Sequence, residues 1–127
     1  MKYLADTNIL IAFINNEQKI IEKFNLIDEV YVSCISIGEL FLGANLSMKK
    51  DKNIFLINSL LACCKMYDIN LQTAKFYAKI KADLRQIGKP IPDNDMWIVA
   101  TALENNLVIA SRDKHILNLN NISSEKW

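Results

Sequence analysis

The sequence contains very little histidine and almost no net charge, and both shortages limit its possible functions. His115 is the only histidine, so a histidine-based metal or acid–base site has little support, and we interpret this residue as a surface side chain. Fifteen Lys and Arg residues against fourteen Asp and Glu leave a net charge of +1. Bulk electrostatics therefore give no argument for binding nucleic acid or an anionic membrane. A phosphate-containing partner requires a local basic patch or a metal ion.

Paired cysteines and long apolar runs are also missing. The three cysteines, Cys34, Cys63 and Cys64, form no CxxC pair and lie in apolar stretches, which predicts buried residues in a reducing compartment. No run approaches the roughly 18 apolar residues that a membrane-spanning helix needs. Asp6 and Asn8 interrupt the N-terminal apolar stretch, so a signal-peptide pattern is absent. We expect a cytoplasmic protein with no membrane partner.

What the sequence does contain is an alternation of two kinds of apolar segment. Short runs rich in β-branched and aromatic residues predict strands at 3–5, 30–35, 66–71 and 107–111, and a weaker pattern indicates a fifth near 121–123. Between them, apolar residues recur at helical spacing. This alternation predicts one α/β domain over residues 1–127. Its parallel sheet has four to five strands and is covered by helices on both faces.

Two helix boundaries are marked clearly in the second half of the chain. Gly88 followed by Pro90 predicts the end of a long amphipathic helix. The segment 96–103 is apolar almost all round, which is typical of a buried helix. Asp93 is best placed as the N-cap of that helix, with an accessory role in metal binding as the alternative.

Four acidic residues occupy comparable positions in the predicted sheet. Asp6 follows the first strand, Glu39 lies four residues after the second, Asp95 is in the first turn of the buried helix, and Asp113 follows the strand at 107–111. In a parallel sheet all four belong to the carboxyl edge, where ligands bind. Carboxylates crowded there repel one another unless a cation lies among them. Oxygen-only ligand sets suit Mg²⁺ or Mn²⁺, and such an ion can promote hydrolysis of a phosphodiester.

Each acid also has a purely structural interpretation. Asp6 can cap the first helix, Glu39 can complete a capping box with Ser36, Asp95 can favour the helix dipole, and Asp113 can cap a turn. The structural interpretation requires four separate coincidences at one edge of the sheet. The metal site explains all four positions together.

Four motifs of this chain resemble those of the PIN-domain ribonucleases, and most closely the VapC-type toxins of toxin–antitoxin pairs. The motifs are LADTNIL at the start of the chain, SIGEL at 36–40, PDNDMWIVATAL at 92–103 and VIASRDKHI at 108–116. Their order and spacing cover about residues 2–117. Taken together they form a specific signal, whereas DTN or SRD alone is a weak one.

The resemblance implies a PIN-like three-layer α/β/α sandwich and a Mg²⁺- or Mn²⁺-dependent endoribonuclease that acts on RNA. The acidic quartet of the family corresponds to Asp6, Glu39, Asp95 and Asp113 in this sequence. Asn8 matches a polar residue that helps to hold the first acid, and Ser111 matches a hydroxyl residue that binds an acid or a metal-bound water. The family also implies a homodimer. The resemblance further implies a small antitoxin protein as partner, which in this family lies over the toxin and often directs a basic side chain toward the acids.

Two other functions remain open from the residues. An aspartyl-phosphate phosphatase uses an Asp after its first strand, but the DxDxT pattern is absent because residue 8 is Asn. A PIN-fold module that binds RNA without cleaving it is the other alternative. Lysines on the long helix and at its exit, including Lys79 and Lys89, are interpreted as a solvated face, with phosphate contacts beside the acids as the alternative. For His115, beside the last acid, the alternative to a surface role is a contact with RNA.

Overall fold

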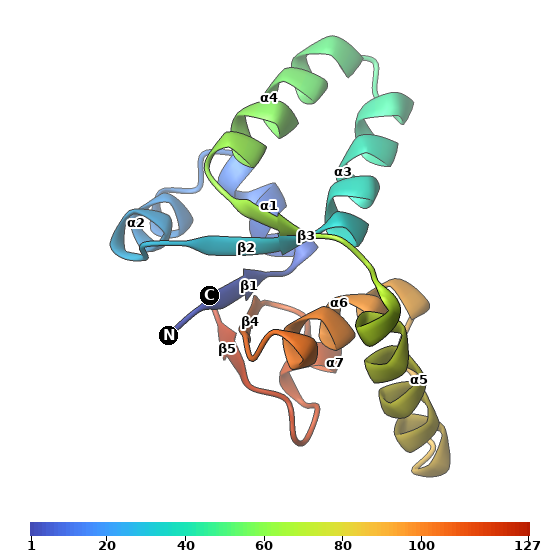
Figure 1. The fold of residues 1–127 in the computed structure, drawn as a ribbon. Helices are drawn as coiled ribbons and strands as arrows, with labels where there is room; N and C mark the ends of the chain where they lie inside the picture. Colours follow the sequence, from blue (N-terminus) through green and yellow to red (C-terminus); the bar gives the residue numbers. More distant parts are fainter.

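The computed structural model describes residues 1–127 and contains one five-stranded sheet (Figure 1). All strand pairs are parallel, and the order is β3-β2-β1-β4-β5. The strands are β1 Tyr3–Ala5, β2 Val30–Ser33, β3 Lys65–Tyr67, β4 Val108–Ser111 and β5 Ser124–Lys126. The predicted parallel sheet is confirmed. The fifth strand begins slightly later than the position the sequence indicated.

Seven helices cover the two faces of the sheet (Figure 1). They are α1 Thr7–Ile14, α2 Gln18–Leu26, α3 Cys34–Leu46, α4 Lys50–Ala62, α5 Leu71–Gln86, α6 Asp93–Glu104 and α7 Lys114–Leu117. Helices α1 to α4 lie on one face, and α5 to α7 lie on the other. The expected three-layer sandwich is therefore present. None of the helices combines the length and the apolar character needed to cross a bilayer.

The two layers follow from the alternation of side chains along each strand. On β1, Ala5 packs into the core under α1 to α4, whereas its neighbour Leu4 packs on the other side with Ile98 of α6. On β4, Ala110 and Ile109 divide between the two cores in the same way. Successive side chains of a strand point to opposite faces, so a short apolar run supplies both cores.

The second strand ends earlier than the sequence suggested, and this changes the environment of Glu39. Helix α3 begins at Cys34, because the Ser33 hydroxyl accepts a hydrogen bond of 3.1 Å from the Ile35 amide and caps the helix. The predicted capping box of Ser36 and Glu39 is therefore wrong. Both residues lie inside the helix, and Ser36 is fully buried.

The end of α5 is the one that the sequence predicted. Gly88 takes a left-handed φ of 67°, and the amide of Lys89 donates to the carbonyl of Leu84 at 2.9 Å. A glycine in this conformation directly after a helix satisfies its last carbonyls and turns the chain away. The segment that follows leads to α6 and brings its N-terminus to the sheet edge.

The cysteines are less buried than expected. All three are free thiols; Cys63 is exposed, and Cys34 and Cys64 are half-buried. Cys63 is the C-cap of α4, which places it at the surface where the helix ends. Burial raises the pKa of Cys64 to about 12, so this thiol stays protonated.

Candidate active site

Asp6 lies between the end of β1 and the start of α1, and both its backbone and its side chain form hydrogen bonds there. Its amide continues the sheet by donating to the Ala110 carbonyl at 2.9 Å. Its Oδ1 accepts the Thr7 amide at 2.8 Å and so caps α1. Its Oδ2 accepts the Ser111 hydroxyl at 2.7 Å and the Asn8 amide at 3.3 Å. The capping role is real, and the second oxygen faces the neighbouring acid-bearing segment.

The environment of Asp6 opposes its ionisation. The residue is only 3% exposed, and burial raises its carboxyl pKa. Hydrogen bonds from Ser111, Thr7 and Asn8 oppose this rise, while the negative charge of Asp113 adds to it. No lysine or arginine forms an ion pair with Asp6. The buried carboxylate is thus positioned by neutral donors and left without a protein cation.

Ser111 connects Asp6 to Asp113. Its hydroxyl donates to Asp6 and accepts the Asp113 amide at 3.0 Å. Asp113 in turn caps α7, accepting the His115 amide at 2.8 Å, and the His115 ring nitrogen Nδ1 lies 3.1 Å from the same oxygen. The expected hydroxyl contact of Ser111 is present. Asp113 remains half-buried at the edge of the sheet, with one oxygen engaged by α7.

Glu39 is brought toward this edge by a contact that the sequence did not reveal. The Thr7 hydroxyl lies 3.0 Å from Glu39 Oε1 and 3.1 Å from the Ser36 hydroxyl. A hydroxyl has one proton and two lone pairs, so donation to the carboxylate leaves a lone pair for Ser36. Thr7 therefore links α1 to α3. Because α3 begins at Cys34 and not at Ser36, Glu39 lies farther into its helix than predicted and still reaches the same edge.

Asp95 is the acid whose pKa is affected by the charges of the other three. It is half-buried in the first turn of α6 and makes no hydrogen bond or ion pair through its side chain. Burial, followed by the charges of Asp6, Asp113 and Glu39, raises its pKa to about 6, and His115 opposes this shift. The carboxyl thus senses all three of the other acids. The four acids therefore form one acidic cluster, in which the only basic side chain in contact with a carboxylate is His115, on Asp113.

Asp93, by contrast, is occupied by other partners. The N-cap of α6 is Pro92, and Asp93 is the first helical residue, so the predicted capping role is wrong. Its carboxylate binds Lys81 Nζ at 2.8 Å and accepts the Tyr77 hydroxyl at 3.1 Å. Lys81 lowers the pKa of Asp93, which keeps this carboxylate ionised and paired. The pair joins α5 to α6 close to Asp95.

The chemistry of the acidic cluster fits a hard, hydrated cation. No three His, Cys, Asp or Glu side chains converge into a ready-made metal cage. Mg²⁺, however, is usually bound by one or two carboxylates and keeps several waters. The quartet offers oxygen donors only, and a cation among them would offset the burial and the repulsion that together raise the pKa of Asp95. Asp6 and Asp95 are the residues best placed to hold such an ion, with Glu39 and Asp113 beside them.

An arginine next to the last acid is a further feature that sequence reasoning missed. Arg112 binds the Glu17 carboxylate through both terminal nitrogens, one of them at 3.0 Å, and its Nε donates to the Trp127 carbonyl at 2.9 Å. Its amide also donates to the Asn8 side chain at 3.2 Å. These contacts attach the segment that carries Asp113 to α2 and to the end of β5. The SRD motif indicated the position of Arg112 in the sequence but not the residues that its side chain contacts.

Comparison with known proteins places this fold and site in a family. The sequence matches the PIN domain over residues 3–121, and the chain belongs to the PIN-domain family. It is similar to Ribonuclease VapC2 of Haemophilus influenzae, with 34% identity over 89% of this chain and 87% of that protein. It is also similar to the tRNA(fMet)-specific endonuclease VapC of Salmonella typhimurium, with 28% identity over 100% of this chain and 98% of that one.

A solved structure agrees with this assignment. VapBC-1 from nontypeable Haemophilus influenzae includes a chain that is 31% identical to this one. The two superimpose with a TM-score of 0.89 over 100% of this chain and 98% of that chain. The resemblance to VapC-type PIN domains that the four motifs indicated is confirmed.

Proposed function

We propose that this chain is the endoribonuclease toxin of a toxin–antitoxin pair and that it hydrolyses RNA phosphodiester bonds at the acidic cluster with Mg²⁺ or Mn²⁺. The observation that carries the proposal is the placement of four carboxylates at one sheet edge, where burial and the charges of the other three acids raise the pKa of Asp95 to about 6. Its relatives named VapC are ribonucleases. A site that gathers four carboxylates without a lysine or arginine paired to them suits a reaction in which a divalent ion binds a phosphate.

The residues of the site divide the work between them. A bound Mg²⁺ or Mn²⁺ would supply Lewis acidity and lower the pKa of water near the phosphate. Asp6 and Asp95 would hold the cation, and Ser111 fixes the orientation of Asp6 through the 2.7 Å hydrogen bond. Thr7 orients Glu39 at 3.0 Å. The raised pKa of Asp95 belongs to the metal-free site, and a bound cation would favour the ionised form of this carboxylate.

A groove beside the acids supports the proposed antitoxin partner. Helices α1, α3 and α4 enclose about 350 Å³, lined by apolar residues such as Ile11 and Leu40 together with Thr7 and Glu39. Ile11 is 46% exposed. An amphipathic helix of a partner can place its apolar face in such a groove. A basic side chain at the end of that partner helix would then reach Glu39 and compete with the cation.

The homodimer is supported by the family resemblance.

The test is cleavage of total cellular RNA by the purified protein with Mg²⁺, with Mn²⁺ and with a chelator. Asp6→Asn and Asp95→Asn remove members of the cluster, and Asp51→Asn is a matched control because Asp51 is an exposed acid in the first turn of α4. We expect discrete fragments that require metal, disappear in the two site variants and persist in the control. Sequencing the fragment ends then names the RNA. Circular dichroism verifies that each variant is folded.

Two outcomes would overturn the proposal in different directions. Intact RNA under every condition, in a preparation free of antitoxin, would indicate an RNA-binding module if the protein still binds RNA. A covalent phosphoenzyme trapped on Asp6 would indicate aspartyl-phosphate chemistry instead.

A further inference from the structure

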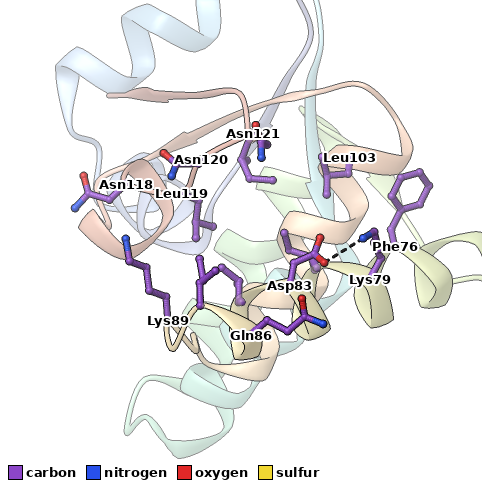
Figure 2. A pocket seen from close by; sticks show the side chains of 14 residues that line it. Phe76, Lys79, Asp83, Gln86, Lys89, Leu103, Asn118, Leu119, Asn120 and Asn121 are labelled. Atoms are coloured by element: carbon purple, nitrogen blue, oxygen red, sulfur yellow. Dashed lines mark hydrogen bonds and ion pairs between the residues drawn. The ribbon is translucent and has the colours of Figure 1, made fainter.

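A groove away from the four acids lies between α5 and the segment that connects α7 to β5 (Figure 2). Its volume is about 580 Å³, within the range of roughly 300–1,000 Å³ that is typical of ligand sites. Phe76 and Ile80 of α5 line one side, and Leu119 and Ile122 line the other. Phe76 is 37% exposed. The groove thus offers apolar surface, including one aromatic ring, to a ligand that can stack.

Hydrogen-bonding groups without partners surround this apolar floor. The amides of Gln86, Asn118, Asn120 and Asn121 line the groove, and none makes a side-chain hydrogen bond within the protein. Lys89 also lines it and forms no ion pair, whereas Lys79 is neutralised by Asp83 at 3.1 Å (Figure 2). The rim therefore carries free amides and one free positive charge.

The groove continues toward the acidic cluster. A second hollow of about 340 Å³ shares Lys89, Asn118 and Leu119 with the first and also includes His115. The His115 ring nitrogen lies 3.1 Å from an oxygen of Asp113. A ligand strand can therefore run from Asp113 past His115 and Lys89 into the larger groove.

We propose that this groove is a nucleotide subsite that holds one unstacked base of a single-stranded RNA whose backbone passes the acidic cluster. The inference rests on the proposed ribonuclease function. A base has two apolar faces and a polar edge, and proteins that read single-stranded RNA stack the faces on aromatic side chains and hydrogen-bond the edge. Asparagine and glutamine amides offer a donor and an acceptor for such an edge. Lys89 contacts a phosphate between the base and the reacting centre. The path from Asp113 and the free lysine favour RNA over a protein segment.

The experiment measures RNA binding separately from cleavage. The Asp95→Asn background is used, and the probe is a short fluorescein-labelled single-stranded RNA of mixed sequence, followed by fluorescence anisotropy. The test variants are Lys89→Ala and the double replacement Asn118→Ala with Asn120→Ala, because Asn121 has a left-handed φ of 63° that alanine disfavours. The matched controls are Lys50→Ala and Asn45→Ala, which change exposed residues of the same types on α4 and α3. Circular dichroism verifies the fold, since all these side chains are exposed.

We expect the double asparagine variant to raise the Kd about tenfold, which is the loss of one base contact. Lys89→Ala should weaken binding and reduce the slope of log Kd against log salt by about 0.7, the value for one phosphate contact on a single strand. The controls should bind as the Asp95→Asn parent does. An unchanged Kd in both test variants would overturn the subsite. If the Kd is unchanged and the variants alter the sedimentation of the protein, the groove is an interface between copies.

The same variants in the wild-type background separate the two proposals. If the wild type cleaves RNA and the groove variants cleave with unchanged KM, only the subsite fails. If the wild type cleaves nothing while the groove variants still lose affinity, the ribonuclease function fails and the groove stands as an RNA-binding site.

Discussion

The Ser111 hydroxyl donates a hydrogen bond of 2.7 Å to Oδ2 of Asp6, across 105 positions of the sequence. The bond joins the carboxyl ends of β4 and β1, which are neighbours in the sheet. Ser111 is fully buried, so no water can replace its hydroxyl without a rearrangement. The same hydroxyl accepts the Asp113 amide at 3.0 Å. One small polar side chain thereby sets the relative positions of two acids of the site.

Replacing Ser111 with alanine tests this arrangement. The change removes the donor of the shortest hydrogen bond that the Asp6 side chain accepts. The pKa of Asp6 therefore rises further, and its carboxylate is held less firmly in place. Removal of such a supporting contact typically costs about 10–100-fold in metal affinity or activity, and we expect RNA cleavage to fall by that amount. Ser111→Thr keeps a hydroxyl and should retain more activity. Ser123→Ala, at an exposed position in the loop before β5, is the control. Full activity in Ser111→Ala would contradict the role of the bond.

The raised pKa of Asp95 predicts how the stability of the metal-free protein depends on pH. The carboxyl titrates near 3.8 when unperturbed and at about 6 in the folded state. Between these values the folded state binds more protons than the unfolded state, so raising the pH through this window destabilises the protein. Asp95→Asn removes the effect. Its Tm in the presence of chelator should exceed that of the wild type near pH 7 and approach it near pH 4.

Thermal melts at a series of pH values provide the measurement. Adding Mg²⁺ to the wild type near neutral pH should then raise its Tm, while Asp95→Asn should respond less. A Tm difference between the two proteins that is the same at every pH would show that folding does not raise the pKa of Asp95.

The sequence predicted those parts of the fold and site that depend on local pattern. Strand ends can be located from short apolar runs, and parallel strands share a carboxyl edge, so Asp6 and Asp113 could be placed together before the structure was known. Gly88 could be recognised as a helix end because a left-handed φ favours glycine. The error at the second strand was also local. Ser33 and Ser36 both fit an N-cap, and the chain uses the first.

The contacts that the sequence did not reveal depend on packing between distant elements. Thr7 meets Glu39 across 32 positions, and Arg112 meets Glu17 across 95. Neither pair has a spacing that a helix or strand period selects. The partners are fixed only when α1 packs on α3 and when β5 closes the edge of the sheet beside β4. For the same reason the sequence placed Asp93 at a cap, although Lys81 on α5 holds it.

The ion pair of Arg112 and Glu17 should affect catalysis through the position of Asp113. Arg112→Ala releases the segment between β4 and α7 from α2 and from the Trp127 carbonyl, and we expect kcat for RNA cleavage to fall several-fold with little change in KM. Arg112→Lys keeps the charge but cannot make the same forked contact, so its activity should be intermediate.

A double-mutant cycle tests whether the effect passes through the pair. Because Glu17→Gln and Arg112→Ala break the same interaction, the double variant should be little worse than Arg112→Ala alone. Additive losses would mean that the two residues act independently.

Asp93 provides the sharpest contrast with Asp95, since the two acids share the first turn of α6. The Asp93 carboxylate binds Lys81 and Tyr77, and an asparagine at this position can still accept from both. An exposed ion pair contributes little to stability, so we expect Asp93→Asn to cleave RNA within about twofold of the wild type and to bind Mg²⁺ equally well. Asp95→Asn should abolish cleavage. Parallel assays of the two variants with a Mg²⁺ titration make the comparison. If Asp93→Asn requires much more Mg²⁺ for the same rate, Asp93 supports the metal directly, and its contact with Lys81 is exchanged for the cation during the reaction.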